Sequence, residues 1–333
     1  MPSAVAGHHS APARIGTKSR WPRRLLRGAV IYVALPYLFV TAIFVLFQRS
    51  LIFRPSRSAP LPAASAELDP HSAEDVEVSA DDGVVLHGWL IRSFRNHERA
   101  EDHRWLMIDF PGNSGHRYER RSDLREIADL GLDVLIVDYR GYAENQGAPT
   151  EERLAADARA VWQAAIDRYR YAPSQIVVFG ESLGGAVATR LAAELGDDAP
   201  AALILASTFN SLADVASWTY PAFPFGILLW DHFDSETRIA GVRCSVIVIH
   251  GADDEFVPVE LGQRLFDAAP ELSAKGVTKR WEKVAGMGHN DVPLHVLRKS
   301  LEDVMASPAI DVDSLPRTGS KRVSLENLCR FCR

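Results

Sequence analysis

The residues with the clearest chemical potential lie at positions 180–184, where the sequence reads Gly-Glu-Ser-Leu-Gly. An apolar β-branched run at 176–179 leads into this pentapeptide, and small residues at 185–190 follow it. A serine on such a sharp turn from strand to helix is raised above the end of a sheet. The N-terminus of the helix beneath it favours developing negative charge. Ser182 is therefore the candidate nucleophile.

A serine hydroxyl becomes a good nucleophile when an imidazole takes its proton and a carboxylate orients that imidazole. His289 is the candidate base, because it lies on a glycine-rich loop after a strand predicted at 279–284. The candidate acids are Asp253 and Asp254, which follow an apolar strand predicted at 245–249. The sequence pattern alone does not separate these two adjacent carboxylates.

Several motifs in one continuous order resemble those of the α/β-hydrolase superfamily. Within the superfamily, the chain resembles the membrane-anchored group that includes the Bem46-like proteins and the ABHD13-type and ABHD17-type serine hydrolases. The motifs lie at 47–53, 82–89, 138–142, 180–185, 250–258 (with the pattern H-G-x-x-D-x-x-V-P) and 288–291. The resemblance covers roughly residues 48–305. It implies that Asp254 is the acid and that Asp253 is a structural neighbour.

The tetrahedral intermediate of acyl transfer needs two N–H donors for its oxyanion. The first expected donor is the backbone of Leu183, the residue after the nucleophile. The second comes from the loop at 111–115, which follows an earlier strand. Similar proteins read His-Gly-Asn where this chain has Pro111 and Asn113, so the resemblance implies that the Asn113 N–H is the second donor. A further departure, at 142–147, is expected to affect substrate contacts.

Strand and helix patterns alternate through the catalytic region. Strands are predicted at 134–139, 176–179, 202–206 and 245–249, and helices at 151–169, 183–195 and 259–268. This alternation predicts an α/β-hydrolase fold, with a mostly parallel central sheet and helices on both faces. We expect the domain to cover residues 73–306, and we expect Asp138 and Arg140 to form a structural pair at a strand end.

A small cap insert is expected at about 207–242, and it is rich in aromatic residues. Inserts at this place often cover the active site of α/β-hydrolases. Two interpretations stay open at this point. The aromatic side chains form an apolar wall for an acyl chain, or they pack the cap onto the domain, as aromatic side chains usually do.

One N-terminal transmembrane helix is predicted at 28–47, where twenty uncharged residues are long enough to cross a hydrocarbon core of roughly 30 Å. A cleaved signal peptide would have a shorter apolar region and a small-residue cleavage site. Six basic residues precede the span and three follow it, which predicts a cytoplasmic N-terminus and an extracytoplasmic catalytic domain, periplasmic in a bacterium. A basic tail at 1–27, a connector at 48–72 and a disordered tail at 307–333 complete the expected organisation.

Composition excludes some partners. A net charge of −6 gives no electrostatic basis for binding nucleic acid. The three cysteines are Cys244, expected to be buried, and Cys329 and Cys332, whose two thiols without further ligands make a poor zinc site. We therefore expect no metal and no cofactor.

These features predict a membrane-anchored serine hydrolase that cleaves a carboxylic ester or thioester with an apolar acyl group, by way of an acyl-enzyme. The expected substrate is a small or lipid-like molecule. A serine peptidase of the same fold is one alternative, because ester and amide cleavage use the same triad. A non-catalytic, membrane-tethered binding protein that keeps the fold is another.

Overall fold

The computed structural model describes residues 21–69 and 71–306. The chain forms two compact units, Met1–Gln48 and Arg49–Arg333. The predicted basic tail up to residue 20, the predicted disordered tail at 307–333 and the Cys329 and Cys332 pair lie outside the described residues.

The first unit, in its described part, is helical. Its segments are α1 (Trp21–Ala29), the π-helical turn η1 (Val30–Ala34) and α2 (Leu35–Ile52), whose last turn belongs to the second unit. Leu25–Ile52 is the one helix in the described part of the chain that is long and apolar enough to cross a membrane, with a mean hydropathy of 2.5. The turn η1 contains Tyr32, whose carbonyl would meet the Pro36 ring in a regular helix, so the wider turn accommodates this proline.

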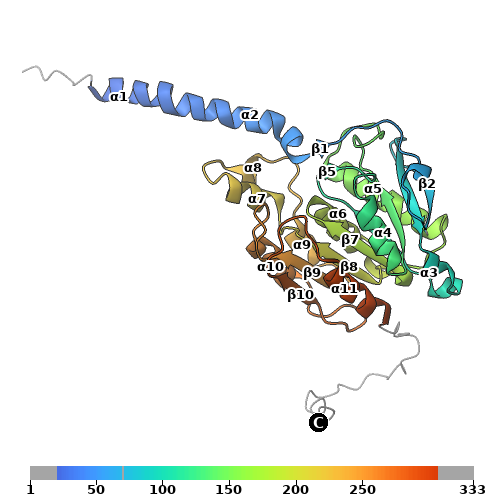
Figure 1. Ribbon diagram of the computed structural model, residues 1–333. Helices are drawn as coiled ribbons and strands as arrows, with labels where there is room; N and C mark the ends of the chain where they lie inside the picture. Colours follow the sequence, from blue (N-terminus) through green and yellow to red (C-terminus); the bar gives the residue numbers. More distant parts are fainter. Residues whose placement is uncertain (1–20, 70, 307–333) are drawn as a thin grey trace, which may run out of the picture. The chain divides into compact units, whose positions relative to one another are not determined.

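The second unit contains an eight-stranded sheet in the order β10-β9-β8-β7-β4-β6-β3-β2 (Figure 1). Its strands are β2 (Ser72–Ser79), β3 (Val85–Arg92), β4 (Leu106–Phe110), β6 (Asp133–Val137), β7 (Ile176–Glu181), β8 (Ala202–Ala206), β9 (Ser245–Gly251) and β10 (Arg280–Val284). Strand β3 is antiparallel to both β2 and β6, and every other neighbouring pair is parallel. The mostly parallel sheet of the predicted fold class is confirmed.

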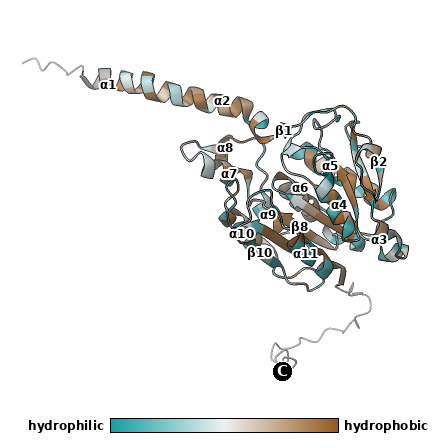
Figure 2. Cartoon of the chain, in the orientation of Figure 1, coloured by the Kyte–Doolittle hydropathy of each residue, from teal (hydrophilic) through white to brown (hydrophobic). Residues whose placement is uncertain are grey.

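Helices cover both faces of this sheet. The helices after β3 are α3 (Phe94–His97), α4 (Arg121–Asp129), α5 (Glu151–Asp167), α6 (Leu183–Glu194), α7 (Leu212–Thr219), α8 (Phe225–Leu228), α9 (Ser235–Ile239), α10 (Val259–Ala268) and α11 (Leu294–Ala306), of which α7, α8 and α9 lie within the predicted cap insert. Successive side chains of a strand point to opposite faces. Val178 of β7 therefore joins a core that contains Val187 of α6, whereas Val177 joins a second core with Leu124 of α4 and Leu297 of α11. Figure 2 shows the central strands as predominantly hydrophobic.

The segment at 48–72 contains more regular structure than its Pro/Ser/Ala-rich composition indicates. Helix α2 continues to Ile52, and β1 (Arg54–Pro55) pairs in parallel with β5 (Ser114–Gly115). A 3-10 turn, η2 (Ala63–Ser65), follows before β2 begins. The segment after the apolar helix is therefore hydrogen-bonded to the loop that follows β4.

Candidate active site

Ser182 occupies the sharp turn between β7 and α6. Its backbone has φ +52° and ψ −118°, a conformation that is costly for a residue with a Cβ atom. Two hydrogen bonds hold the turn: the Ser182 N–H donates to the Ala206 carbonyl at 2.9 Å, and the Thr208 hydroxyl donates to the Ser182 carbonyl at 2.7 Å. The neighbouring strand thus maintains the strained geometry that exposes the serine at the end of the sheet.

The glycines around the serine are required by close backbone packing. A Cβ atom on Gly184 would lie 1.9 Å from the Phe110 carbonyl oxygen, and one on Gly180 would lie 2.5 Å from the Gly184 carbonyl oxygen. A Cβ atom on Gly185 would lie 2.3 Å from the Thr208 hydroxyl. The sequence pattern of this turn therefore follows from steric limits at three positions.

The structure brings together the three side chains that the sequence singled out. His289 Nε2 lies 3.0 Å from Ser182 Oγ, and His289 Nδ1 lies 2.8 Å from Asp254 Oδ2. The three residues follow β7, β9 and β10 at the carboxyl ends of these parallel strands. With Nδ1 protonated, the imidazole donates to the carboxylate and can accept the serine proton at Nε2.

Asp254 is held as an ionised acceptor. Its side chain is fully buried, and Oδ1 accepts hydrogen bonds from the N–H groups of Phe256 at 2.9 Å and Val257 at 2.8 Å. Burial raises the pKa of Asp254, but interactions with His250, His289 and the Val257 N–H outweigh it and hold this pKa well below its ordinary value. The carboxylate therefore carries its charge throughout the neutral range.

The residues beside Asp254 have different surroundings. Asp253 is exposed, so the structure places Asp254 and not its neighbour against the imidazole. His250, at the end of β9, is fully buried. Its Nε2 lies 2.9 Å from the Val257 carbonyl oxygen and 3.4 Å from Asp254 Oδ2. His250 thus helps to shape the loop that carries the acid.

The two expected oxyanion donors lie on either side of the serine. Leu183 is the first residue of α6, so its N–H has no acceptor within the helix. The loop at 111–115 approaches from the other side, since a Cβ atom built on Gly112 would lie 3.7 Å from the Ser182 Cβ. Both segments therefore lie close to Ser182, and the role of their N–H groups as oxyanion donors stays a prediction.

Asn113 is anchored by three hydrogen bonds. Its side-chain amide donates to the Ile52 carbonyl at 2.8 Å, and its own carbonyl accepts from the Tyr142 hydroxyl at 2.7 Å and the Arg54 N–H at 3.0 Å. None of these bonds uses the Asn113 backbone N–H. The loop is therefore braced by the end of α2 and by β1, a contact that sequence reasoning missed because these positions are about 60 residues from Asn113.

At Pro111, where similar proteins have histidine, a tyrosine hydroxyl holds the loop. The Tyr139 hydroxyl donates to the Pro111 carbonyl at 2.8 Å. Burial raises the pKa of Tyr139 well above its ordinary value, so the phenol remains a donor at any physiological pH. This bond ties the loop to the residues after β6 in a chain that lacks the usual histidine.

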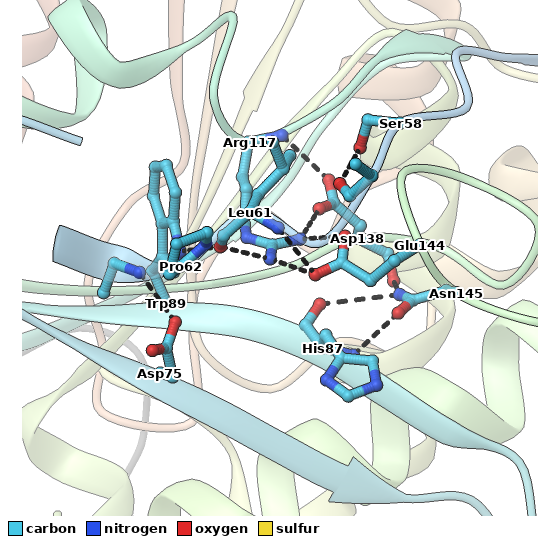
Figure 3. A network of polar contacts seen from close by, with 12 residues as sticks. Ser58, Leu61, Pro62, Asp75, His87, Trp89, Arg117, Asp138, Glu144 and Asn145 are labelled. Atoms are coloured by element: carbon cyan, nitrogen blue, oxygen red, sulfur yellow. Dashed lines mark hydrogen bonds and ion pairs between the residues drawn. The ribbon is translucent and has the colours of Figure 1, made fainter. Parts of the chain in front are cut away.

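A second brace involves Arg117, which follows the same loop (Figure 3). Its guanidinium is buried and forms ion pairs with Asp138 and with Glu144, and it donates to the Leu61 carbonyl at 2.8 Å. It also lies over the Trp89 ring, 5.2 Å from the centroid. Glu144 belongs to the second departure, at 142–147, which was expected to affect substrate contacts. In the structure this side chain is directed to Arg117 instead.

The expected Asp138 and Arg140 pair does not form. Asp138 binds Arg117, whereas the fully buried Arg140 binds Asp157 at 2.5 Å and Asp82 at 2.8 Å. Both residues are structural, as expected, but each takes its partners from other segments. The prediction of the pair was wrong because neighbouring positions after a strand can face different parts of the fold.

Sequence reasoning also missed a charged cluster beneath the nucleophile. Arg120 forms an ion pair with Glu181, the residue before Ser182, and its Nε lies 3.8 Å from Asp109 Oδ2. Asp109 is buried in β4, and burial raises its pKa to about 6 although the Arg120 charge opposes this change. The one available signal was a carboxylate within the otherwise apolar run of β4.

The aromatic side chains of the cap differ in burial, and Phe223 is half-buried. Phe209, Phe225 and Phe233 are buried, whereas Trp218, Tyr220 and Trp230 are exposed. The packing interpretation therefore describes the buried group, and in the exposed group Tyr220 still contacts the Phe225 ring, with centroids 6.0 Å apart. Outside the cap, Phe256 is 66% exposed with its ring centroid 5.4 Å from that of His289, which places an apolar side chain beside the candidate base.

The described residues contain no group of three or more His, Cys, Asp and Glu side chains that could hold a metal ion. Cys244 is buried, and burial raises the pKa of its thiol to about 12. A thiol with so high a pKa is inert, because the thiolate is the reactive form.

Comparison with known sequences agrees with this architecture. The sequence model of a family described as alpha/beta hydrolase fold matches residues 106–244. An uncharacterised protein of Mycobacterium tuberculosis is 42% identical over 247 residues, which cover 74% of this chain and 82% of that protein. The alpha/beta hydrolase domain-containing protein WAV2 of Arabidopsis thaliana is 32% identical over 65% of this chain and 74% of its own length. Lysophosphatidylserine lipase ABHD12 of Danio rerio is 33% identical over 55% of this chain and 50% of its own length.

Solved structures show the same fold. The esterase Pf2001 of Pyrococcus furiosus matches with a TM-score of 0.58 at 18% identity, over 76% of this chain and 97% of that one. An alpha-beta hydrolase of Vibrio vulnificus matches with a TM-score of 0.55 at 20% identity, over 70% and 80% of the two chains. The chain belongs to the α/β-hydrolase superfamily, as the order of its sheet, the turn at Ser182 and these relatives show.

Proposed function

We propose that this protein is a membrane-anchored serine hydrolase that cleaves a carboxylic ester or thioester with an apolar acyl group. The observation that carries the proposal is the continuous hydrogen-bonded series from Ser182 through His289 to Asp254, with distances of 3.0 and 2.8 Å. The relative ABHD12 is named as a lysophosphatidylserine lipase, which supports a lipid-like acyl ester as the substrate.

In the first step, Ser182 Oγ attacks the carbonyl carbon while its proton passes to His289 Nε2. The carbonyl π electrons move to oxygen, and the N–H groups of Leu183 and Asn113 stabilise the resulting oxyanion. Asp254, which keeps its negative charge, stabilises the imidazolium and maintains its orientation. The low pKa of Asp254 suits this role, because a carboxylate that took up a proton would lose the charge that it supplies.

The tetrahedral intermediate then collapses. The bond from the carbonyl carbon to the leaving oxygen or sulfur breaks, and His289 gives its proton to the leaving group. Water attacks the resulting acyl-enzyme as His289 accepts one of the water protons, and a second collapse releases the carboxylic acid and returns the proton to Ser182. The cycle consumes one water and needs no further reactant.

Membrane attachment through the apolar helix Leu25–Ile52 is part of the proposal. The excess of basic residues before this helix supports a cytoplasmic N-terminus and an extracytoplasmic catalytic domain. A site near a membrane suits substrates that are themselves held there by an acyl chain.

The test is turnover by the full-length chain in nanodiscs. It would compare p-nitrophenyl esters from acetate to palmitate, an acyl thioester and a series of peptide p-nitroanilides, with Ser182→Ala as the background. We expect ester or thioester turnover that increases with acyl length and disappears in the variant. Faster cleavage of the peptides would favour the peptidase alternative. A folded protein with no turnover of any substrate would favour the non-catalytic binding protein.

A further inference from the structure

The outer surface of the cap carries apolar side chains that the proposed chemistry does not use. Between Asp214 and Asp231 the sequence has sixteen consecutive residues without an ionised side chain, 215–230. This segment, which includes most of α7 and all of α8, is here named the cap surface. Within it, Ile227 is 82% exposed and Trp218 is 62% exposed.

The cap surface is folded with its apolar residues on two sides. Phe225 and Leu229 are buried, and the Phe225 ring packs edge-on against Tyr220 with centroids 6.0 Å apart. These inner contacts fix α8 while Ile227, between the two buried residues, points outward. The exposure of Ile227 therefore does not come from an unpacked loop. Large exposed apolar side chains on a packed segment mark a surface for interaction with a protein, a ligand or a membrane.

The far end of the cap surface is tied to the residue that follows the first unit. Arg49 Nε donates to Asp231 Oδ2 at 2.7 Å, and the Arg49 guanidinium lies 5.4 Å from the centre of the Trp230 ring. Asp231 is itself buried and accepts from the Glu151 N–H at 3.0 Å, so the attachment is rigid. The cap surface thus ends at the point where the chain leaves the predicted membrane span.

We propose that the cap surface lies in the interfacial layer of the membrane, with Ile227 and Trp218 among the lipids. The partner is a lipid surface, because the segment is uncharged, carries Trp and Tyr residues that favour membrane interfaces, and is tied at its C-terminal end to Arg49, just after the predicted span. This inference rests on the membrane anchor of the proposed function and deepens it. The cap would receive an acyl substrate directly from the bilayer, so that the acyl chain of the substrate need not pass through water.

The test is the depth of a spin label in the full-length chain in nanodiscs. The label would be attached at Ile227→Cys in a background with Cys329→Ser and Cys332→Ser, since Cys244 is buried. Collision rates with oxygen, which concentrates in lipid, and with a water-soluble nickel chelate report the surroundings of the label. The matched control is Leu272→Cys, because Leu272 is 54% exposed on the loop between α10 and β10. A label at Phe39→Cys, within the predicted span, gives the collision ratio expected in lipid.

We expect the ratio of oxygen to nickel collisions at Ile227 to be severalfold higher than at Leu272 and to approach the ratio at Phe39. Equal ratios at Ile227 and Leu272, with a lipid-like ratio at Phe39, would overturn the docking of the cap. A water-like ratio at Phe39 would overturn the anchor and the docking together. Ester turnover by the same samples reports the hydrolase separately, so its failure is distinguishable from either result.

A second variant tests the consequence for substrate supply. Ile227→Glu places a charge on the cap surface, and its high exposure means that the fold does not depend on this side chain. We expect a severalfold higher apparent KM for a long-chain ester in vesicles, with unchanged turnover of a short soluble ester. Leu272→Glu, the matched control, should change neither value. An unchanged KM for the vesicle substrate in Ile227→Glu would contradict the proposal.

Discussion

Two adjacent carboxylates, Asp253 and Asp254, differ in their burial and in their distance from the candidate base. Asp254 is buried, accepts two backbone N–H groups and lies 2.8 Å from His289 Nδ1, whereas Asp253 is exposed. Sequence spacing could not separate them, because hydrogen bonds of the loop decide which side chain turns inward. The family resemblance pointed to Asp254, and the geometry places Asp254 at the imidazole.

This difference gives a paired prediction. Asp254→Asn should lower kcat by about 10⁴-fold with little change in KM, as loss of the triad carboxylate does in an unrelated fold, because the imidazole loses its orienting charge. Asp253→Asn should leave kcat within about twofold, as expected for an exposed side chain away from the imidazole. Steady-state kinetics on one soluble ester provides both values. A larger loss in Asp253→Asn than in Asp254→Asn would contradict the assignment.

Asp109 gives a prediction for pH-dependent stability. Burial raises its pKa from 3.8 to about 6, so the folded protein binds a proton more tightly than the unfolded chain does. The contribution of Asp109 to stability is therefore greatest below pH 4 and decreases as the pH rises to about 6 and above. A difference of about two pKa units corresponds to a change of about 3 kcal/mol in the free energy of unfolding.

The measurement compares the wild type with Asp109→Asn, which cannot titrate. Denaturant unfolding between pH 4 and 7 should show the free energy of the variant rising relative to that of the wild type. Subtracting the two curves removes the titration of all other carboxylates. A difference that stays constant across this range would show that Asp109 does not titrate as its buried position predicts.

At the scale of elements, the loop at 111–115, which carries the proposed second oxyanion donor, is held by a segment outside the central sheet. The Asn113 side chain donates to the carbonyl of Ile52, the last residue of α2, and β1 pairs with β5 beside it. Asn113→Ala removes this side-chain bond and keeps the backbone N–H. We expect kcat to fall by about 10-fold with KM unchanged, less than the 10²–10³-fold loss of a complete oxyanion donor. Ser114→Ala is the control, since Ser114 is exposed on the same loop.

Turnover of a soluble ester in detergent would provide both kinetic values for these variants. Normal kcat in Asn113→Ala would show that the loop does not need its attachment to α2. A change confined to KM would mean that Asn113 contacts substrate and does not position the donor.

The elements that position the site could be predicted well where local patterns decide them. The β7 strand, the tight turn at Ser182 and helix α6 followed from an apolar run, two glycines and a small-residue segment. The braces could not be predicted. Arg117 and Glu144 are 27 positions apart, and each is an ordinary polar residue until the fold brings it to the other. Contacts of this kind leave no periodic signal in one sequence.

At the scale of the whole molecule, the orientation in the membrane is a prediction from charge alone. Alkaline phosphatase, which is active only outside the bacterial cytoplasm, should be active when it is fused after residue 306 in a bacterial host. Alkaline phosphatase fused directly after residue 27 lacks the span, so it should stay in the cytoplasm and be inactive. The protein should also stay in the membrane fraction after a carbonate wash. An inactive fusion after residue 306 would contradict the predicted topology. Release of the protein by carbonate would contradict the membrane span.

The most direct test of the account is covalent labelling of the full-length protein with a fluorophosphonate probe, followed by mass spectrometry of the labelled peptide. An activated serine beside His289 predicts one adduct, on Ser182, which is absent in Ser182→Ala and strongly reduced in His289→Ala. Equal labelling of the wild type and Ser182→Ala, or an adduct on another serine, would contradict the claim that Ser182 is the nucleophile.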